Sequence, residues 1–416
     1  MSEEQKSLTI GFKRRLQMPP SLESAPEVAG FLRRLCSRFA IDMHTWSWSL
    51  SLEVRVEMDA DSQFVAASCI GMSAAEALAA VATTPFCVAL TAASRAYPGI
   101  DRNAMAAQMP ATRNAMAALM PALTSVTRLT SLDLAENWLG EAGVASLAPG
   151  LATMTNLTKL NLAFNDLEDL GATSLAPALA MMQLTSLSMG GNDLGPAAFA
   201  SLAPAFVRMT KLTSLDLRTS PSETAGAATL ALALATMTQL RLLNLSNALG
   251  GVGAATLLAP ALAKLAQLTE LNLEENGLDD AGAASLAPAL AMMPQLTSLN
   301  LSDNDLFEAA AASLAPALAT LTRLTSLNLG LNDLGAAGAA SLAPALEKLT
   351  HLTNLDLGNN TLGIAGATAL APTLASMTQL TQLELSYNQF GDAGLALLAS
   401  ALGKDWFARC YFFHDN

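Results

Sequence analysis

One nine-residue pattern returns at a nearly constant interval through most of this chain. It reads L-T-S-L-D-L-A-E-N at Leu129–Asn137, and nine further copies follow. They begin at Leu157, Leu184, Leu212, Leu240, Leu268, Leu296, Leu324, Leu352 and Leu380. Eight of the nine intervals are 28 residues and the other is 27. A fixed period of this length predicts a one-dimensional stack of supersecondary units rather than a globular domain around one core.

Each repeat has two halves of different periodicity. In the sixth repeat, Leu268, Leu271 and Leu273 are spaced to point inward from a short strand, and Asn276 is expected to turn the chain. Residues 282–293, G-A-A-S-L-A-P-A-L-A-M-M, then return as a helix with one apolar face. Strands connected by helices predict a parallel sheet that is covered on one side.

A proline recurs inside the helical half of eight repeats. An interior proline removes one helical hydrogen bond and normally costs about 3 kcal/mol. We therefore expect the freed carbonyls to lie on the outer surface, where water can bind them. The column consists of Pro149, Pro177, Pro204, Pro260, Pro288, Pro316, Pro344 and Pro372.

An asparagine recurs at the end of the strand half. A buried amide needs hydrogen-bond partners, so we expect each side chain to bind the turn backbones of adjacent repeats. This column is predicted to be structural and not catalytic. It consists of Asn137, Asn165, Asn192, Asn276, Asn304, Asn332, Asn360 and Asn388.

The fourth and fifth repeats are irregular. The fourth has residues 220–222, Ser-Pro-Ser, where Asn-x-Leu is expected, and its helix lacks the proline. In the fifth, residues 247–249, Asn-Ala-Leu, come one position early. A local change of twist between Arg218 and Leu258 is one interpretation, and neutral drift in a tolerant loop is the other.

The repeat resembles a known family. The 28-residue period, the L-x-x-L-x-L-x-x-N-x-L strand and the G-A-x-x-L-A helix look like leucine-rich repeats of the ribonuclease-inhibitor type, over about residues 112–404. The helix motifs at residues 171–176, 338–343 and 366–371 also resemble those of the GALA subclass of bacterial effectors. The resemblance implies an α/β solenoid, a horseshoe with a concave parallel β-sheet and convex helices, which acts by binding other proteins.

The departures from that family limit which of its functions can be expected of this chain. Ribonuclease inhibitors are cysteine-rich, whereas this array is nearly free of cysteine, which argues against inhibition of ribonucleases. GALA effectors carry an all-helical N-terminal F-box, and residues 1–100 contain an alternating stretch at Trp46–Met58 that is typical of a strand. The remaining alternatives are a substrate-recognition subunit of a ubiquitin ligase, a pathogen-type effector and a GTPase-regulating leucine-rich repeat protein.

Residues 1–100 do not follow the repeat and predict a small α+β or helical module of unknown type. Phe31–Ile41 is expected to form a short amphipathic helix, and Trp46–Met58 a half-buried strand. Ser73–Ser94 is expected to form an alanine-rich helix broken near Pro85. Its uncharged part, Ala77–Ser94, is long enough to be a candidate membrane span, which its composition disfavours.

The two ends of the array are expected to be capped. Residues 101–128 contain a duplicated word, R-N-A-M-A-A-x-M-P, and are predicted to form capping helices or a half repeat. The ten full repeats occupy residues 129–404. Residues 405–416 contain five aromatic residues, and we expect them to form a C-terminal cap; a docking tail is the alternative.

Charge and cysteine content bound the function. The chain has a net charge of −13, and residues 120–404 hold 10 basic and 22 acidic residues, so −12 falls on the repeats. Such an array should repel nucleic acid and favour basic partners. The four cysteines form no C-x-x-C, and the start lacks a secretory signal pattern, which together predict a cytoplasmic protein with no membrane segment.

The strand positions between the leucines are expected to face the concave side. The residue between the second and third leucine is polar in every repeat, and the residue after the first leucine is threonine in nine. Acidic residues gather in the sixth and seventh repeats, and large side chains lie near the recurring asparagine in four repeats. The predicted partner-binding residues are Asp133, Glu136, Trp138, Phe164, Asp216, Glu270, Glu274, Glu275, Asp303, Leu331, Asp356 and Tyr387.

Aromatic and acidic side chains on a concave wall suit a protein or peptide that carries basic residues. The sequence therefore predicts a non-catalytic interaction scaffold; the alternative is that the acids only keep an alanine- and leucine-rich array soluble. No enzyme is predicted, because the chain lacks nucleophile, phosphate-binding and metalloprotease motifs and its three histidines have no companion ligands. No cofactor or metal is predicted either.

Overall fold

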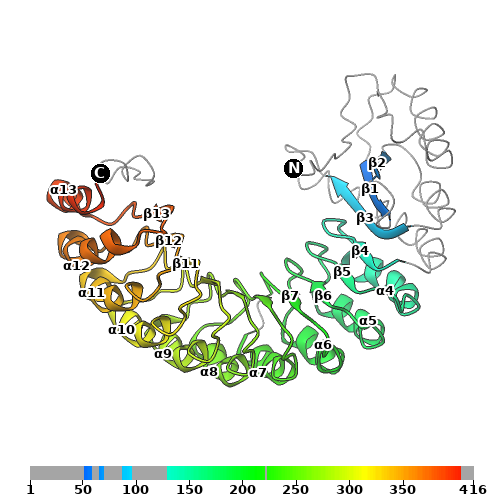
Figure 1. Cartoon of the computed structure of the whole chain (residues 1–416). Helices are drawn as coiled ribbons and strands as arrows, with labels where there is room; N and C mark the ends of the chain where they lie inside the picture. The colour runs from blue at the N-terminus through cyan, green and yellow to red at the C-terminus, as the bar shows by residue number, and fades with distance from the viewer. Residues whose placement is uncertain (1–50, 59–64, 70–86, 96–128, 221–222, 404–416) are drawn as a thin grey trace, which may run out of the picture. The chain divides into compact units, whose positions relative to one another are not determined.

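The computed structural model describes residues 51–58, 65–69, 87–95, 129–220 and 223–403, with the backbone alone for the first three ranges. The chain forms two compact units, Met1–Asn192 and Asp193–Asn416. Figure 1 shows the strand–helix units of both.

The first unit begins with three longer strands: β1 (Ser51–Met58), β2 (Val65–Cys69) and β3 (Cys87–Arg95). Strand β1 pairs antiparallel with β2 and with β3. Strand β3 then pairs in parallel with β4 (Ser131–Asp133), with Leu90 opposite Leu132. The edge of the first repeat strand is therefore covered by a strand of the N-terminal module, which leaves no unpaired ladder there.

The structure confirms one prediction for this module and corrects another. The strand predicted over Trp46–Met58 is present as β1 from Ser51 onward. The helix predicted over Ser73–Ser94 is wrong from Cys87, because Cys87–Arg95 forms β3 between β1 and β4. Pairing on both edges outweighs the helix propensity of the alanines in this stretch. The predictions for Phe31–Ile41 and for residues 101–128 and 405–416 lie outside the described residues.

The rest of the first unit alternates strands and helices. Strands β4, β5 and β6 pair in parallel with Leu132, Leu160 and Leu187 in register. The further elements are α4 (Gly140–Leu151), β5 (Lys159–Asn161), α5 (Glu168–Leu179) and β6 (Ser186–Ser188).

The second unit continues the alternation and begins with a helix. Its strands β7 to β13 pair in parallel in chain order, each offset from its neighbour by 28 residues. The elements are α6 (Pro196–Arg208), β7 (Ser214–Asp216), α7 (Glu223–Leu234), β8 (Leu242–Asn244), α8 (Val252–Leu262), β9 (Glu270–Asn272), α9 (Asp279–Leu290), β10 (Ser298–Asn300), α10 (Glu308–Leu318), β11 (Ser326–Asn328), α11 (Gly335–Leu346), β12 (Asn354–Asp356), α12 (Gly363–Ser376), β13 (Gln382–Glu384) and α13 (Gly391–Leu402). Within this unit the strands line the inner side of the curve and the helices the outer side (Figure 1).

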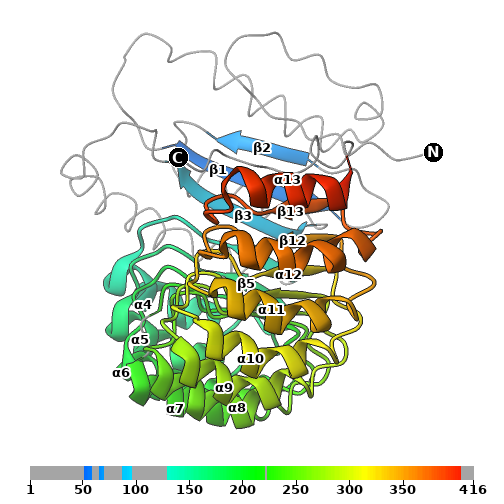
Figure 2. The same ribbon diagram turned by 90° about the vertical axis from the view of Figure 1, so that its left-hand side faces the viewer.

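Leucines and alanines form one continuous core between sheet and helices in each unit. The central strand leucine of every repeat is at most 2% exposed, from Leu132 to Leu383. Neighbouring helices pack directly on one another, and Figure 2 shows α8 to α13 stacked in order. The helix glycines allow this approach: a Cβ on Gly338 would lie 3.2 Å from the Cβ of Ala311 on the preceding helix. This is the predicted repeat solenoid, with the parallel sheet covered on one side only.

The proline column lies on the outer surface, as predicted. All eight prolines are exposed, and each lies inside a helix that continues past it. The residue four positions before each proline, whose carbonyl loses its helical partner, is exposed in every case. Water can therefore bind these carbonyls. Among the described helices, none has the length and apolarity needed to cross a membrane.

Candidate functional site

The asparagine column forms a buried ladder that ties each turn to the next. The Nδ2 of Asn304 donates to the carbonyl of Leu273 in the preceding repeat, at 2.8 Å, and to that of Ser302 in its own repeat, at 2.9 Å. Its Oδ1 accepts a bond from the backbone N–H of Asn276, at 3.0 Å. All eight asparagines are at most 6% exposed. The structural role predicted for this column is confirmed.

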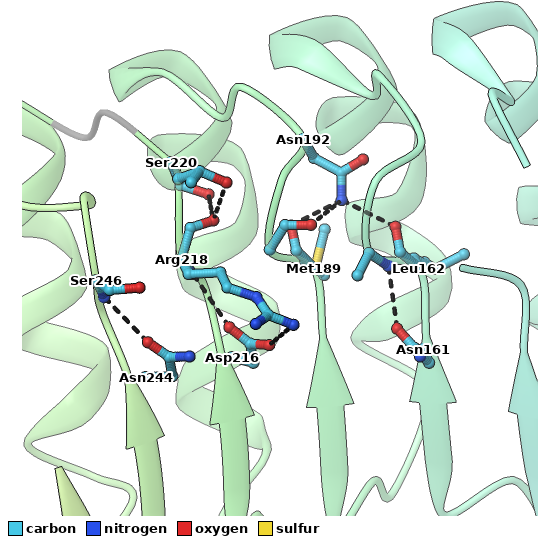
Figure 3. A network of polar contacts seen from close by, with 12 residues as sticks. Asn161, Leu162, Met189, Asn192, Asp216, Arg218, Ser220, Asn244 and Ser246 are labelled. Carbon is cyan, nitrogen blue, oxygen red and sulfur yellow. Dashed lines mark hydrogen bonds and ion pairs between the residues drawn. The ribbon is translucent and has the colours of Figure 1, made fainter. Parts of the chain in front are cut away.

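The ladder is altered in the fourth and fifth repeats. Ser220 and Ala248 stand at the asparagine position there, and both are buried. The Ser220 hydroxyl lies 3.4 Å from the carbonyl of Arg218, within its own repeat (Figure 3). The early turn of the fifth repeat is accommodated, because the Oδ1 of Asn276 accepts bonds from the N–H groups of both Ala248 and Leu249. Strands β7 and β8 keep an unbroken parallel register, and the predicted change of twist stays a prediction.

The threonine column is also part of the scaffold. In seven repeats the threonine hydroxyl donates to the backbone carbonyl of the equivalent residue in the preceding repeat, at 2.9–3.2 Å. Arg241 replaces threonine in the fifth repeat, and its side chain is exposed. These hydroxyls extend the ladder at the start of each strand, so the single proton of each is already donated to the backbone.

The polar column between the second and third leucine binds the turn that follows it. In nine repeats a side-chain oxygen accepts the backbone N–H two residues later, as Asp216 does from Arg218 and Asn244 from Ser246 (Figure 3). The predicted site residues Asp133, Asp216 and Asp356 belong to this column and are half-buried. The second carboxylate oxygen of Asp216 forms an ion pair with Arg218, at 3.3 Å.

Asp356 lies in the most crowded part of this column. Its carboxylate leans over Gly330, where a Cβ would come within 2.8 Å of its Oδ1, and Glu384 leans in the same way over Gly358. Burial raises the pKa of Asp356, the N–H of Gly358 opposes the rise, and the nearby Glu384 carboxylate adds to it. The charged form of Asp356 is therefore disfavoured in the folded protein.

The residue directly before the ladder asparagine, here called the rim position, has a left-handed backbone in all ten repeats. Its φ lies between 48° and 69°. In eight repeats its N–H donates to a carbonyl of the following repeat, so the parallel ladder continues to this point. The rim residues are Glu136, Phe164, Gly191, Thr219, Asn247, Glu275, Asp303, Leu331, Asn359 and Tyr387. Most of their side chains are exposed, and this row carries half of the predicted site residues.

The predicted acidic cluster is present in the second unit. Glu270 on β9, Glu275 and Asp303 are exposed, while Glu274 is half-buried and accepts a bond from the Nδ2 of Asn300, at 3.1 Å. Of the described residues, no group of three or more acidic, histidine or cysteine side chains is placed to hold a metal ion.

Two further acids that the sequence places near this cluster have other roles. The Oδ1 of Asp279 accepts N–H groups of its own helix, α9. The Oδ1 of Asp280 accepts the N–H groups of Phe307, at 3.0 Å, and Ala310, at 2.8 Å, and so caps the next helix, α10. Such capping between repeats was not evident from the sequence, because it needs a side chain 27 residues earlier to reach the helix start.

The predicted apolar anchors are exposed to different extents. Trp138 is 36% exposed and lies two positions after the rim residue Glu136. Phe164 is 44% exposed and lies against Gly191, whose missing Cβ would meet the Phe164 ring. Leu331 is 52% and Tyr387 59% exposed. Asp133, Glu136, Trp138 and Phe164 belong to the first unit, and the other eight predicted residues belong to the second.

A family model supports the repeat assignment. A family model described as Leucine Rich repeat matches residues 127–148, 153–176, 266–287, 320–343, 348–371 and 376–399. A search of the curated proteins gave no match. Among solved structures, the chain is similar to an internalin (inlF) from Listeria monocytogenes str. 4b F2365, at 20% identity and a TM-score of 0.43. That similarity covers 82% of this chain and 89% of that chain. The ribonuclease-inhibitor subtype stays a prediction, whereas the repeat matches and the buried ladder identify the chain as a leucine-rich repeat protein.

Proposed function

We propose that this chain is a non-catalytic scaffold that binds a basic protein or peptide on the sheet side of its second unit, in the cytoplasm. Leucine-rich repeat arrays generally use the open face of the sheet to bind other proteins. In the second unit the helices cover only the outer side of β7 to β13, so the inner side of the sheet is open to a partner (Figure 1).

The observation that carries this proposal is the uneven distribution of charge along the second unit. Residues 264–308 contain one lysine and eight acidic residues, a net charge of −7. Residues 209–249 contain three basic and two acidic residues, a net charge of +1. Of the eight acids, Glu270, Glu275 and Asp303 are exposed and are not used to cap a helix or close a turn. Concentrated charge of one sign attracts and orients a partner of the other sign.

A charge reversal on the full-length protein tests the proposal. Glu270→Lys with Glu275→Lys leaves the hydrogen bond of Glu274 intact and changes the charge of the exposed acids alone. We expect binding of a fluorescent octalysine peptide, followed by anisotropy, to weaken about 3- to 30-fold at low salt and less at physiological salt. Circular dichroism verifies that the variant is folded.

A matched control separates the site from the overall charge. Glu347→Lys with Asp392→Lys makes the same change in net charge at two exposed positions, the C-cap of α11 and the first turn of α13. This control is expected to bind octalysine within about twofold of the unchanged protein, because the attraction of distant charges is screened. Equal weakening in both variants would show that octalysine responds to net charge and not to this site.

A further inference from the structure

We propose that the rim positions of the last five repeats bind an extended segment in one direction. A basic residue lies over Glu275 and Asp303, and two apolar residues follow over Leu331 and Tyr387. This inference rests on the proposed function and specifies the partner that the sheet face would accept.

The order of the rim residues carries the direction. From the sixth repeat to the tenth, the row reads Glu275, Asp303, Leu331, Asn359 and Tyr387, and all five side chains are exposed. It is acidic at one end and apolar at the other. The positions directly before the rim in the eighth and ninth repeats, Gly330 and Gly358, add no side chain beside Leu331, and the Asp356 carboxylate that leans over Gly330 is held by the N–H of Gly358. A ligand with one charged and one apolar end is therefore matched in one orientation only.

The backbone at Leu331 and Tyr387 supports a role for their side chains. Both residues have φ near 55°, a region that favours glycine and asparagine, which occupy the same row at Gly191 and Asn359. Leu331 and Tyr387 are each more than half exposed, so burial does not offset the cost of this conformation. Bulky side chains held in a strained and solvent-facing position are typical of contact residues.

The strand spacing sets the spacing of the ligand. Strands β9 to β13 are consecutive and in parallel register, and neighbouring strands lie about 4.8 Å apart. Leu331 lies two strand spacings from Glu275, and Tyr387 lies two from Leu331, or about 10 Å in each case. An extended chain advances about 3.3 Å per residue and covers that distance in three residues. The matching ligand pattern is basic-x-x-apolar-x-x-apolar.

The neighbouring charges limit where the basic residue can bind. In the fifth repeat, Arg241 is exposed directly before β8 and would repel a basic residue of the ligand. At the far end, Asp356 and Glu384 lie on the strands and not on the rim. One oxygen of each is occupied by the N–H of Gly358 or Ser386. The basic residue is therefore best placed over Glu275 and Asp303.

Two capped peptides of identical composition test the order on the full-length protein. The ordered peptide is Lys-Lys-Ser-Leu-Ser-Ser-Phe, and in the other, Leu-Ser-Lys-Lys-Ser-Ser-Phe, the lysines lie between the apolar residues; each carries a fluorophore on an N-terminal Gly-Gly linker. We expect the ordered peptide to bind about tenfold more tightly by anisotropy. Leu331→Asn and Tyr387→Asn, which keep a residue suited to positive φ, should each remove most of that preference. Asn247→Gly, at the exposed rim position of the fifth repeat and outside the five that the peptide spans, is the control that keeps it.

The possible failures are distinguishable. Equal binding of the two peptides, or binding of neither, would overturn the directional inference. The proposed function would still stand if octalysine binding depends on Glu270 and Glu275. If the charge reversal at Glu270 and Glu275 leaves the octalysine affinity unchanged, both the proposed function and this inference are wrong.

Discussion

The polar side chains of a single repeat divide into those that build the array and those that remain at its surface. The asparagine, the threonine and the polar residue between the second and third leucine all bind backbone groups. In eight repeats the rim residue contributes its backbone N–H to the ladder. Of the four polar positions in the strand half, the rim position thus leaves its side chain most available to a partner.

Removal of one ladder asparagine should destabilise the array severely. Asn304→Ala leaves the N–H of Asn276 without this partner and removes one of the two bonds to each of the carbonyls of Leu273 and Ser302. An orphaned buried N–H costs about 1–3 kcal/mol and each further lost bond about 0.5–1.5 kcal/mol, so we expect a loss of at least about 2 kcal/mol in the free energy of unfolding. Urea denaturation followed by circular dichroism measures it.

A second asparagine provides the control for this experiment. Asn354 is half-buried, and its Nδ2 donates to the Oε1 of Gln382 in an exposed contact. Asn354→Ala should cost less than about 0.5 kcal/mol. If the two substitutions have the same effect, the ladder does not stabilise the array in the way its geometry indicates.

The raised pKa of Asp356 predicts a pH-dependent gain of stability on neutralisation. Because the folded-state pKa lies above the usual 3.8, the contribution of this carboxyl to stability is fully present below that pH and is lost as pH rises through the folded pKa. Asp356→Asn keeps an acceptor for the N–H of Gly358 and removes the charge beside Glu384. We expect about 0.2–1 kcal/mol of added stability at neutral pH and none below pH 3.8.

The converse substitution is the matched test. Asn328→Asp places a carboxylate in the same column, beside Asp356 on the next strand. It should lower the melting temperature at neutral pH and have little effect in acid. A variant Asp356→Asn that melts lower at neutral pH than the unchanged protein would contradict the account of this carboxylate.

The roles of these residues were only partly predictable from the sequence. The asparagine ladder was predicted because a buried amide at a fixed period has few other uses. The turn-binding role of Asp133, Asp216 and Asp356 was not. A polar residue at a strand position reads as solvent-facing, and only the turn of the backbone directly after the strand brings the N–H two residues later within reach.

At the scale of the helix, the prolines are tolerated because of where they lie. Each removes a hydrogen bond whose carbonyl faces water. Helix α7 has Leu232 at the equivalent position, and this side chain is 73% exposed. The helix thus keeps the geometry of the others with a full set of backbone donors.

This arrangement predicts that α7 tolerates a proline at position 232 but not at the adjacent position 231. Leu232→Pro frees the carbonyl of Ala228, which is half-buried, and should cost less than about 1 kcal/mol. Ala231→Pro frees the carbonyl of Ala227, which is fully buried, and should cost about 3 kcal/mol or more. Thermal unfolding of the two variants makes the comparison, and similar melting temperatures would show that the outward position is not what allows proline.

Elements with a strong internal period were predictable, and those that depend on distant pairing were not. The strands and helices of the ten repeats follow from leucine spacing alone. Strand β3 does not, since its alanine-rich sequence favours a helix and only the edges of β1 and β4 make it a strand. Such pairing between segments distant in sequence leaves little trace in local composition.

At the scale of the whole molecule, stability is expected to be uneven along the array. In a stack of repeats each unit is stabilised by its neighbours, and in the second unit the asparagine ladder runs from Asn276 to Asn388. Ser220 and Ala248 replace it in the two preceding repeats. The backbone amides of residues 219–249 should therefore exchange with solvent fastest among the repeats of this unit.

Hydrogen exchange followed by mass spectrometry of peptides measures this difference. The eighth and ninth repeats, with Asn332 and Asn360 in the ladder, are the internal reference. Uniform protection through all seven repeats of the second unit would show that the altered ladder does not weaken that region.

The left-handed rim position affects how the sequence of such an array can vary, both in evolution and in engineered libraries. Eight different residue types occupy this one position in ten repeats, from glycine to tyrosine, and the backbone there keeps one conformation. The rim therefore accepts side chains of very different size and charge within one fold, at a conformational cost that is smallest for glycine and asparagine. A combinatorial library that varies one codon per repeat would sample new recognition surfaces while leaving the leucines, threonines and asparagines untouched.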